Sequence, residues 1–213
     1  MTARLVRIEN AGPDMKARRL VFDDETTRMT SAAAVKTLAL GESDNPLADV
    51  VEEALAGVEP QLAKDHALRL LGFRERSTAE LSRRLLDAGY PAAVTRPVLD
   101  RFRELDLVND ERFARVWASS RAAAGYGRRR VAQELTQKGV DAGTVRTVLD
   151  AAFDADAQVD LARAALRGAR PSTRAERERL LRRLVSRGFD MSSARAAIDM
   201  SDPDVQGDAS SAD

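Results

Sequence analysis

The sequence repeats itself at an interval of about 50 residues, and this repeat restricts the possible fold more than any other feature. Its anchors are three glycines, Gly89, Gly139 and Gly188. Apolar residues precede each glycine by eight and by four positions, and another apolar residue follows it directly. These are Leu81, Leu85 and Tyr90, then Val131, Leu135 and Val140, and finally Leu180, Leu184 and Phe189. The pattern predicts tandem copies of one supersecondary unit.

Each offset indicates a helix or its end. Apolar residues four apart lie on one helical face, and a glycine four positions later suits the left-handed conformation that ends a helix. The spacing predicts an earlier helix in each unit, at Leu62–Phe73, Glu111–Ala124 and Asp160–Arg167. A later helix carries the apolar pairs Val98-Leu99, Val148-Leu149 and Ala197-Ile198. Ser77 and Thr173 each begin a capping box. Every unit is therefore expected to be a three-helix bundle.

The segment before the repeats has a different pattern. Polar and apolar residues alternate over 4–9 and, more loosely, over 19–23, and the turn-forming residues 10–14 lie between them, which predicts a β-hairpin. A short helix is expected at about 31–40, beginning after Ser31 and closed by Gly41. The predicted fold is mainly α, with three tandem three-helix repeats (helix-turn-helix-like units) in an elongated array after a small N-terminal β-hairpin.

The predicted domain boundaries follow from these patterns. Residues 1–45 form the hairpin, the short helix and a linker, and the repeats occupy 46–108, 109–153 and 154–200. Residues 201–213 carry aspartates, serines and alanines with few apolar residues, so we expect a disordered acidic tail.

Composition excludes several kinds of site. The chain has no cysteine and one histidine, His66, which excludes disulfides, thiolate chemistry and histidine clusters. We expect no catalytic residues, no metal and no cofactor, and hence a protein that is not an enzyme. No apolar run approaches the ~20 residues of a membrane span, and the N-terminus lacks the apolar core of a signal peptide. The expectation is a soluble, cytoplasmic monomer.

The formal net charge is zero, but its distribution is uneven. Residues 64–150 carry 17 basic and 12 acidic side chains, and residues 1–63 carry 7 and 11. The most basic stretch runs from Arg121 to Val131. Its glycines, Gly125 and Gly127, would let the backbone approach a partner closely. Arg128, Arg129 and Arg130 would then lie in the first turn of a helix, where the helix dipole disfavours cations.

From this placement we expect the arginine triplet to form a contact surface and to contribute little to folding. Guanidinium groups bind phosphates and carboxylates equally well. The charge pattern alone therefore leaves open whether the partner is a nucleic acid or an acidic protein surface.

Three segments of the sequence resemble the RecX family of regulatory proteins. They are Arg74–Leu85, with its arginine, serine and Glu-Leu pattern; Leu107–Ala114; and the central block from Arg121 to Val140. The resemblance covers roughly residues 61–199. It implies three tandem three-helix units and a regulator of the RecA recombinase. Such a regulator binds RecA and its filament on single-stranded DNA, lies in the filament groove, and inhibits ATPase, strand-exchange and coprotease activity.

The resemblance also implies a role in homologous recombination, DNA repair and the SOS response. Carried over by position, the candidate partner-binding residues are Arg121, Tyr126, Arg128, Arg129, Arg130, Arg74, Arg76 and Arg84. Because the net charge is zero and the tail is acidic, we expect at most weak direct binding to DNA alone beside binding to the RecA filament.

Two other classes of function compete with this interpretation. A helical DNA-binding module of the helix-turn-helix type would also be built from three-helix units, and would contact duplex DNA, usually as a dimer. An enzyme on a helical scaffold is the second alternative, which the lone histidine and the missing cysteines disfavour.

Overall fold

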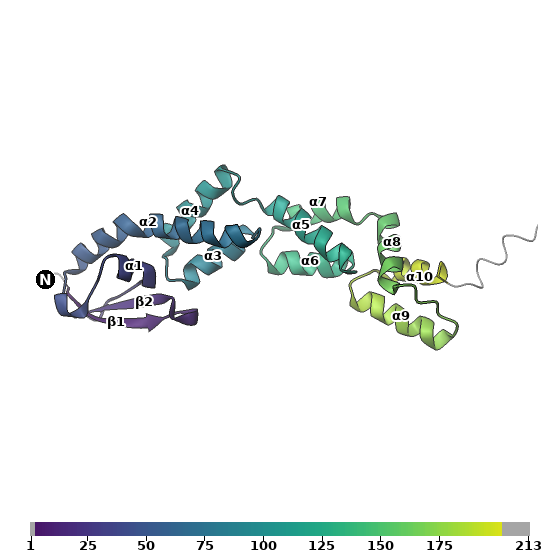
Figure 1. The fold of residues 1–213 in the computed structure, drawn as a ribbon, viewed down its shortest axis with the longest axis horizontal. Coiled ribbons are helices and arrows are strands. Elements are labelled where there is room, and N and C mark those ends of the chain that lie inside the picture. The colour runs from purple at the N-terminus through teal and green to yellow at the C-terminus, as the bar shows by residue number, and fades with distance from the viewer. Residues whose placement is uncertain (1–2, 202–213) are drawn as a thin grey trace, which may run out of the picture. The chain divides into compact units, whose positions relative to one another are not determined.

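A computed structural model describes residues 3–201, which divide into two compact units with the chain boundary between Asn109 and Asp110. Figure 1 shows a mainly helical chain with one small sheet at the N-terminal end. Each unit contains two hydrophobic clusters of buried residues. The expected disordered tail, apart from Ser201, lies outside the described residues. No helix among those described is both long and apolar enough to cross a membrane.

Unit 1 begins with a three-stranded antiparallel sheet, not with a two-stranded hairpin. Its strands are β1 (Leu5–Ala11), β2 (Ala17–Phe22) and β3 (Thr27–Ser31), in the order β1-β2-β3. The first two strands confirm the predicted hairpin, and a short 3-10 helix at Pro13–Met15 forms part of its turn. The prediction missed β3 because its sequence, Thr-Arg-Met-Thr-Ser, contains little of the apolar alternation that marks a strand.

Two helices cover one face of this sheet (Figure 1). Helix α1 (Ala32–Thr37) begins as predicted, since the Ser31 side chain accepts a hydrogen bond from the Ala34 amide at 3.0 Å. It ends before Gly41, because the backbone is already left-handed at Ala39. Helix α2 (Ala48–Phe73) starts well before the predicted Leu62.

The length of α2 links the sheet to the first repeat. Near its N-terminus, Val51 and Leu55 pack with Leu20 and Phe22 of the sheet. Further along, Ala63 and Ala67 belong to the core of repeat 1, which also holds Leu81, Leu85 and Phe102. Repeat 1 is completed by α3 (Thr78–Asp87) and α4 (Ala92–Glu104).

Unit 2 contains the two further repeats. The helices of repeat 2 are α5 (Asp110–Ala123), α6 (Arg128–Gln137) and α7 (Ala142–Ala152). Those of repeat 3 are α8 (Ala155–Leu166), α9 (Arg174–Ser186) and α10 (Met191–Asp199). The predicted fold class, three tandem three-helix units after a small β element, is confirmed.

The three anchor glycines end the middle helix of each repeat in the same way. Gly89, Gly139 and Gly188 all have positive φ angles, of 94°, 77° and 93°. The amide of the residue after each glycine donates to the carbonyl five residues earlier, at 3.1 Å from Tyr90 to Leu85 and at similar lengths in the other repeats. These bonds are those of a Schellman closure, which pairs carbonyls that a helix end leaves free.

Gly89 also brings repeat 1 onto the sheet. A Cβ atom at this position would lie 2.1 Å from the Thr30 carbonyl oxygen, so only glycine permits the contact. Beside it, the buried Glu59 carboxylate accepts a hydrogen bond from the Thr30 hydroxyl at 2.6 Å and pairs with Arg28 at 3.1 Å. At the junction of the sheet and repeat 1, the two backbones therefore lie close together and polar side chains pair with each other.

Candidate partner-binding surface

The arginine triplet lies where expected, in the first turn of α6, but its glycines serve an internal contact. A Cβ atom on Gly127 would lie 2.4 Å from the backbone nitrogen of Phe189. The Gly127 amide donates to the Arg187 carbonyl at 2.9 Å, and the Arg129 amide donates to the Gly188 carbonyl at 3.0 Å. The backbone at this position, which we expected to lie close to a partner, therefore lies against repeat 3 of the same unit.

This junction changes the electrostatics of the triplet. The carboxyl end of α9, which carries partial negative charge, meets the amino end of α6, which carries partial positive charge. The expected conflict between the arginines and the α6 dipole is therefore offset by the neighbouring helix end. Free amides of one helix and free carbonyls of the other satisfy each other.

A buried carboxylate holds two of the candidate arginines in repeat 2. Glu134 accepts hydrogen bonds from Arg121 Nε at 2.7 Å, Arg130 Nε at 3.0 Å and Trp117 Nε1 at 3.0 Å. Burial acts to raise the pKa of Glu134, but the bonds from Arg130, Trp117 and Arg121 outweigh it and hold that pKa below its ordinary value. The carboxylate is therefore ionised at neutral pH and locks its partners in place.

Arg121 is further immobilised by aromatic rings. Its guanidinium carbon lies 4.6 Å from the centre of the Trp117 ring and 5.4 Å from that of Tyr126. Tyr126 itself is half-buried against the repeat 2 core. Arg121 and Tyr126 thus have structural roles, and the proposal that they also contact a partner stays a prediction.

Repeat 1 contains an equivalent cluster around Glu80. The buried Glu80 carboxylate pairs with Arg74 at 2.5 Å, with Arg76, and with Arg84 at 3.6 Å. Arg76 is itself buried, and its Nε donates to the Leu70 carbonyl at 3.0 Å. The three candidates of this repeat surround one internal charge: Arg74 and Arg76 tie the chain before α3 to its first turn, and Arg84 pairs within α3.

The remaining two members of the triplet differ from each other. Arg128 pairs with Asp150 on α7 at 2.5 Å and is 30% exposed. Arg129 is exposed, and its side chain makes no hydrogen bond or ion pair to any described residue. Arg128 and Arg130 therefore have internal ion pairs that the sequence analysis did not foresee, and the expectation that the triplet contributes little to folding stays a prediction.

The sequence analysis listed the candidate arginines but did not identify the carboxylates that neutralise them. The spacing of Arg130 and Glu134, one helical turn apart, and of Arg76, Glu80 and Arg84 was a usable signal. Within unit 2 the structure leaves a different set of guanidiniums exposed and without an internal hydrogen bond or ion pair. Besides Arg129, this set comprises Arg146, Arg167, Arg170, Arg179, Arg182 and Arg195. We call these seven residues the free arginine set.

The single histidine and the carboxylates of residues 3–201 do not form a metal-binding group. No group of three or more histidine and carboxylate side chains that could hold a metal occurs there. His66 packs edge-on against Tyr90, with ring centres 5.9 Å apart. Burial, with the charges of Arg69, Lys16 and Arg84, lowers the pKa of His66, as for a packed neutral imidazole.

Comparison with known proteins agrees with this architecture. Residues 63–102 match the pattern of the first three-helix domain of RecX, and residues 109–149 match that of the second. The chain is 39% identical over 151 residues to the regulatory protein RecX of Halorhodospira halophila, a match covering 70% of this chain and 94% of that protein. It is 40% identical to its counterpart from Mycolicibacterium smegmatis, covering 62% of this chain and 75% of that one.

Two solved structures share the fold. A crystal structure of a regulatory protein RecX aligns with a TM-score of 0.57 at 18% identity, covering 90% of this chain and 96% of that chain. The structure of RecX from Lactobacillus salivarius aligns with a TM-score of 0.60 at 20% identity, covering 67% and 96%. The three-helix units, both domain patterns and a relative matched over nearly its whole length lead to one conclusion: this chain belongs to the RecX family of regulatory proteins.

Proposed function

We propose that this protein binds the RecA recombinase and its filament on single-stranded DNA and thereby inhibits ATPase, strand-exchange and coprotease activity. Membership of the RecX family carries the proposal, because the matched relative is a regulatory protein and the match spans 94% of it. In this account the chain acts as a monomer in the cytoplasm by occupying a surface of the filament, and it performs no chemistry of its own.

The charge of unit 2 supports contact with an anionic partner. Residues 110–201 carry 18 basic and 12 acidic side chains. Since many of the acidic groups are already paired, the free arginine set keeps its positive charge available. These guanidiniums can form paired hydrogen bonds with carboxylates of a protein or with phosphates of DNA. We place the contact on this set, with Arg129 as the member shared with the sequence-based candidates.

The test is binding of charge-neutralised variants to RecA filaments on single-stranded DNA. The triple variant Arg129→Gln, Arg182→Gln, Arg195→Gln should bind at least tenfold more weakly, which corresponds to ~1.4 kcal/mol. Added salt should reduce the difference in filament affinity between the wild type and the triple variant, because exposed charges are screened beyond ~10 Å at 0.1 M. Thermal unfolding should change little, since these side chains make no internal hydrogen bond or ion pair.

A matched control is Lys36→Gln on α1, an exposed lysine without an internal ion pair. It should bind as the wild type does. If the triple variant also binds normally at low salt, the free arginines are only a solvated surface. If it instead binds naked duplex DNA less well while filament binding is unchanged, the alternative of a helix-turn-helix DNA-binding module gains support.

A further inference from the structure

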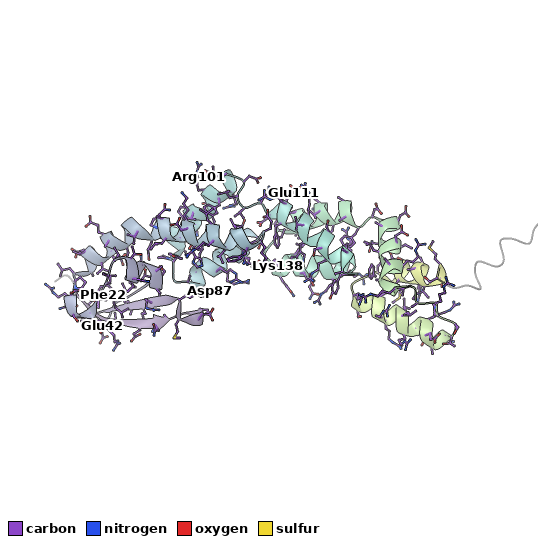
Figure 2. All side chains as sticks on the ribbon, viewed as in Figure 1. Phe22, Glu42, Asp87, Arg101, Glu111 and Lys138 are labelled. Atoms are coloured by element: carbon purple, nitrogen blue, oxygen red, sulfur yellow. The ribbon has the colours of Figure 1, made fainter. Side chains whose placement is uncertain are left out.

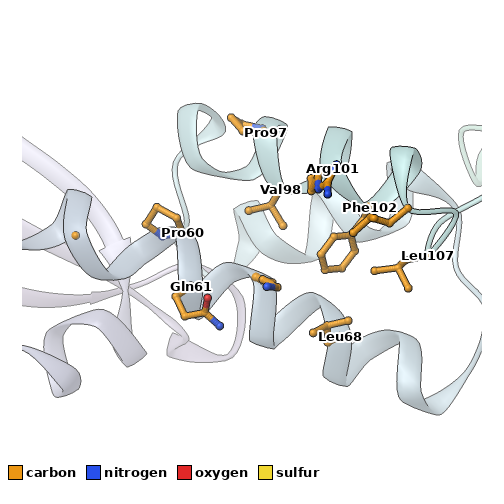
Figure 3. Close-up of a pocket in the computed structure, with 11 residues that line it drawn as sticks. Pro60, Gln61, Leu68, Pro97, Val98, Arg101, Phe102 and Leu107 are labelled. Atoms are coloured by element: carbon orange, nitrogen blue, oxygen red, sulfur yellow. The ribbon is translucent and has the colours of Figure 1, made fainter.

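Unit 1 contains an open apolar groove that none of its own side chains fills. The groove has a volume of about 540 Å³ and lies between α2 and α4 (Figure 3). Phe102 and Val98 contribute to its apolar lining, together with Leu68, Leu105 and Leu107. The last three are 39%, 50% and 39% exposed, so large apolar side chains here face solvent.

Two residues in the α2 wall are of types that are unfavourable in the interior of a helix. Gly57 and Pro60 are both exposed, lie in the interior of α2 and line the groove. Relative to alanine, an interior glycine costs about 1 kcal/mol and a proline about 3 kcal/mol. A Cβ atom on Gly57 would meet nothing within 4 Å, and its φ is not positive, so neither packing nor backbone conformation requires glycine. A bare backbone at this position does suit the close approach of a second helix.

The charges on the groove have one sign. The charged lining residues are Lys64 and Arg101, both cations. Arg101, which projects from α4 (Figure 2), pairs with Glu104 at 2.8 Å. The lining residue Gln61 donates a hydrogen bond to Asp65, which does not line the groove. Lys64 is exposed and makes no ion pair within the described part of the chain. The groove therefore offers an apolar floor with an unneutralised ammonium group at its edge.

From these observations we infer that the groove is a docking site for a short amphipathic helix of a protein partner, with apolar residues on one face and a carboxylate opposite Lys64. Its α2 wall runs from Gly57 to Leu68, which at ~1.5 Å per residue is long enough for about three turns of an occupant helix. Insertion of an apolar helical face between two helices is a recurrent mode of peptide recognition. The inference rests on the proposed function for the partner's identity: the helix belongs to RecA.

The decisive variant fills the groove without harming the fold. Gly57→Leu places a side chain in open space and replaces a poor helix former by a good one. It should therefore unfold at an equal or higher temperature than the wild type, yet bind RecA filaments at least tenfold more weakly. Because stability and binding move in opposite directions, misfolding cannot explain such a result.

Matched controls come from the same chain. Gly72→Leu introduces the same bulk elsewhere in α2, at a glycine that is equally unobstructed and does not line the groove, and it should bind as the wild type does. Lys64→Glu should weaken binding, whereas Lys36→Glu on α1 should not. The measurement is filament binding of the full chain by anisotropy, paired with a thermal melt and with sedimentation of the protein alone.

The outcomes separate this inference from the proposed function. If the wild type fails to bind RecA filaments, the proposed function is wrong and the inference is overturned with it. If the wild type binds and Gly57→Leu binds equally well, only the groove assignment is wrong. It is equally overturned if Gly57→Leu loses binding to naked single-stranded DNA, or converts a self-associated wild type into a monomer, since the occupant is then nucleic acid or a second copy.

Discussion

Two buried glutamates, Glu80 and Glu134, hold five of the seven candidate arginines in internal ion pairs. Each gathers guanidiniums that a count of basic residues had assigned to the outside. The sequence could reveal the pairs one helical turn apart, but Arg121 and Glu134 are 13 positions apart and meet only because α5 packs against α6. Long-range pairing of this kind depends on tertiary structure, and the candidate list changed for that reason.

The Glu134 cluster yields a stability prediction. Glu134→Gln removes the charge that three donors share, and hydrogen bonds to charged groups contribute ~1.5–3 kcal/mol. We expect the free energy of unfolding of the protein to fall by about 2 kcal/mol at pH 7, measured by denaturant titration. Arg129→Gln, which changes charge without breaking an internal bond, should alter it by less than ~0.5 kcal/mol.

The loss of stability caused by Glu134→Gln should depend on pH. The pKa of Glu134 is lower in the folded protein than its ordinary value of 4.5. Its stabilising contribution is therefore complete above that value and is lost as the pH falls through the folded pKa. The difference between wild type and Glu134→Gln should shrink in acid. A difference that stayed constant from pH 7 to pH 3 would show that the charge of Glu134 is unimportant.

At the scale of elements, the closing glycines were the most accurate part of the sequence analysis. Helix periodicity and glycine spacing predicted a left-handed residue at Gly89, Gly139 and Gly188, and the structure has one at each. The spacing could not predict which backbone each closure approaches. That depends on packing between modules: Gly89 meets the Thr30 carbonyl of β3, and Gly188 meets Arg130 at the start of α6.

A glycine can be required for its positive φ alone, or also for a close contact with another module. Two glycines in repeat 3 allow these two requirements to be tested separately. Gly168 and Gly188 both have positive φ, but a Cβ atom on Gly168 would meet nothing within 4 Å, whereas one on Gly188 would lie 2.4 Å from the Arg130 nitrogen. Gly168→Ala should cost only the ~1–2 kcal/mol of a left-handed alanine. Gly188→Ala should cost ~1–3 kcal/mol more, because the α6 backbone must move.

Hydrogen exchange would locate the effect of Gly188→Ala. Faster exchange should centre on the first turn of α6 and the last turn of α9, whose groups bond across the junction. Equal costs for the two alanine variants would contradict the close contact between repeats 2 and 3.

The sequence analysis predicted strand β3 and helix α2 poorly, because contacts with other elements stabilise both. Strand β3 has a weak apolar pattern and forms by pairing with β2, for example Thr30 opposite Arg18. Helix α2 runs through Gly57 and Pro60, which local propensity treats as breaks. Its contacts with the sheet at one end and with repeat 1 at the other hold it helical.

At the scale of the molecule, the periodicity and three motifs were sufficient to predict the fold class and the family. The domain boundaries 46–108, 109–153 and 154–200 remain our proposal for the extent of the repeats. The proposed partner-binding surface could not be predicted from the sequence, because its definition uses the charges that the fold leaves unpaired and a groove that packing forms. We therefore propose contacts with RecA on the free arginine set and in the groove between α2 and α4.

The most direct test of this account is the ATPase rate of RecA on single-stranded DNA with increasing amounts of the purified protein. We expect inhibition that is complete with fewer molecules of this protein than of RecA, with the DNA intact and with no nucleotide hydrolysis when RecA is omitted. An unchanged RecA rate at equimolar protein, or hydrolysis of nucleotide by this protein alone, would contradict the central claim that it regulates RecA by binding.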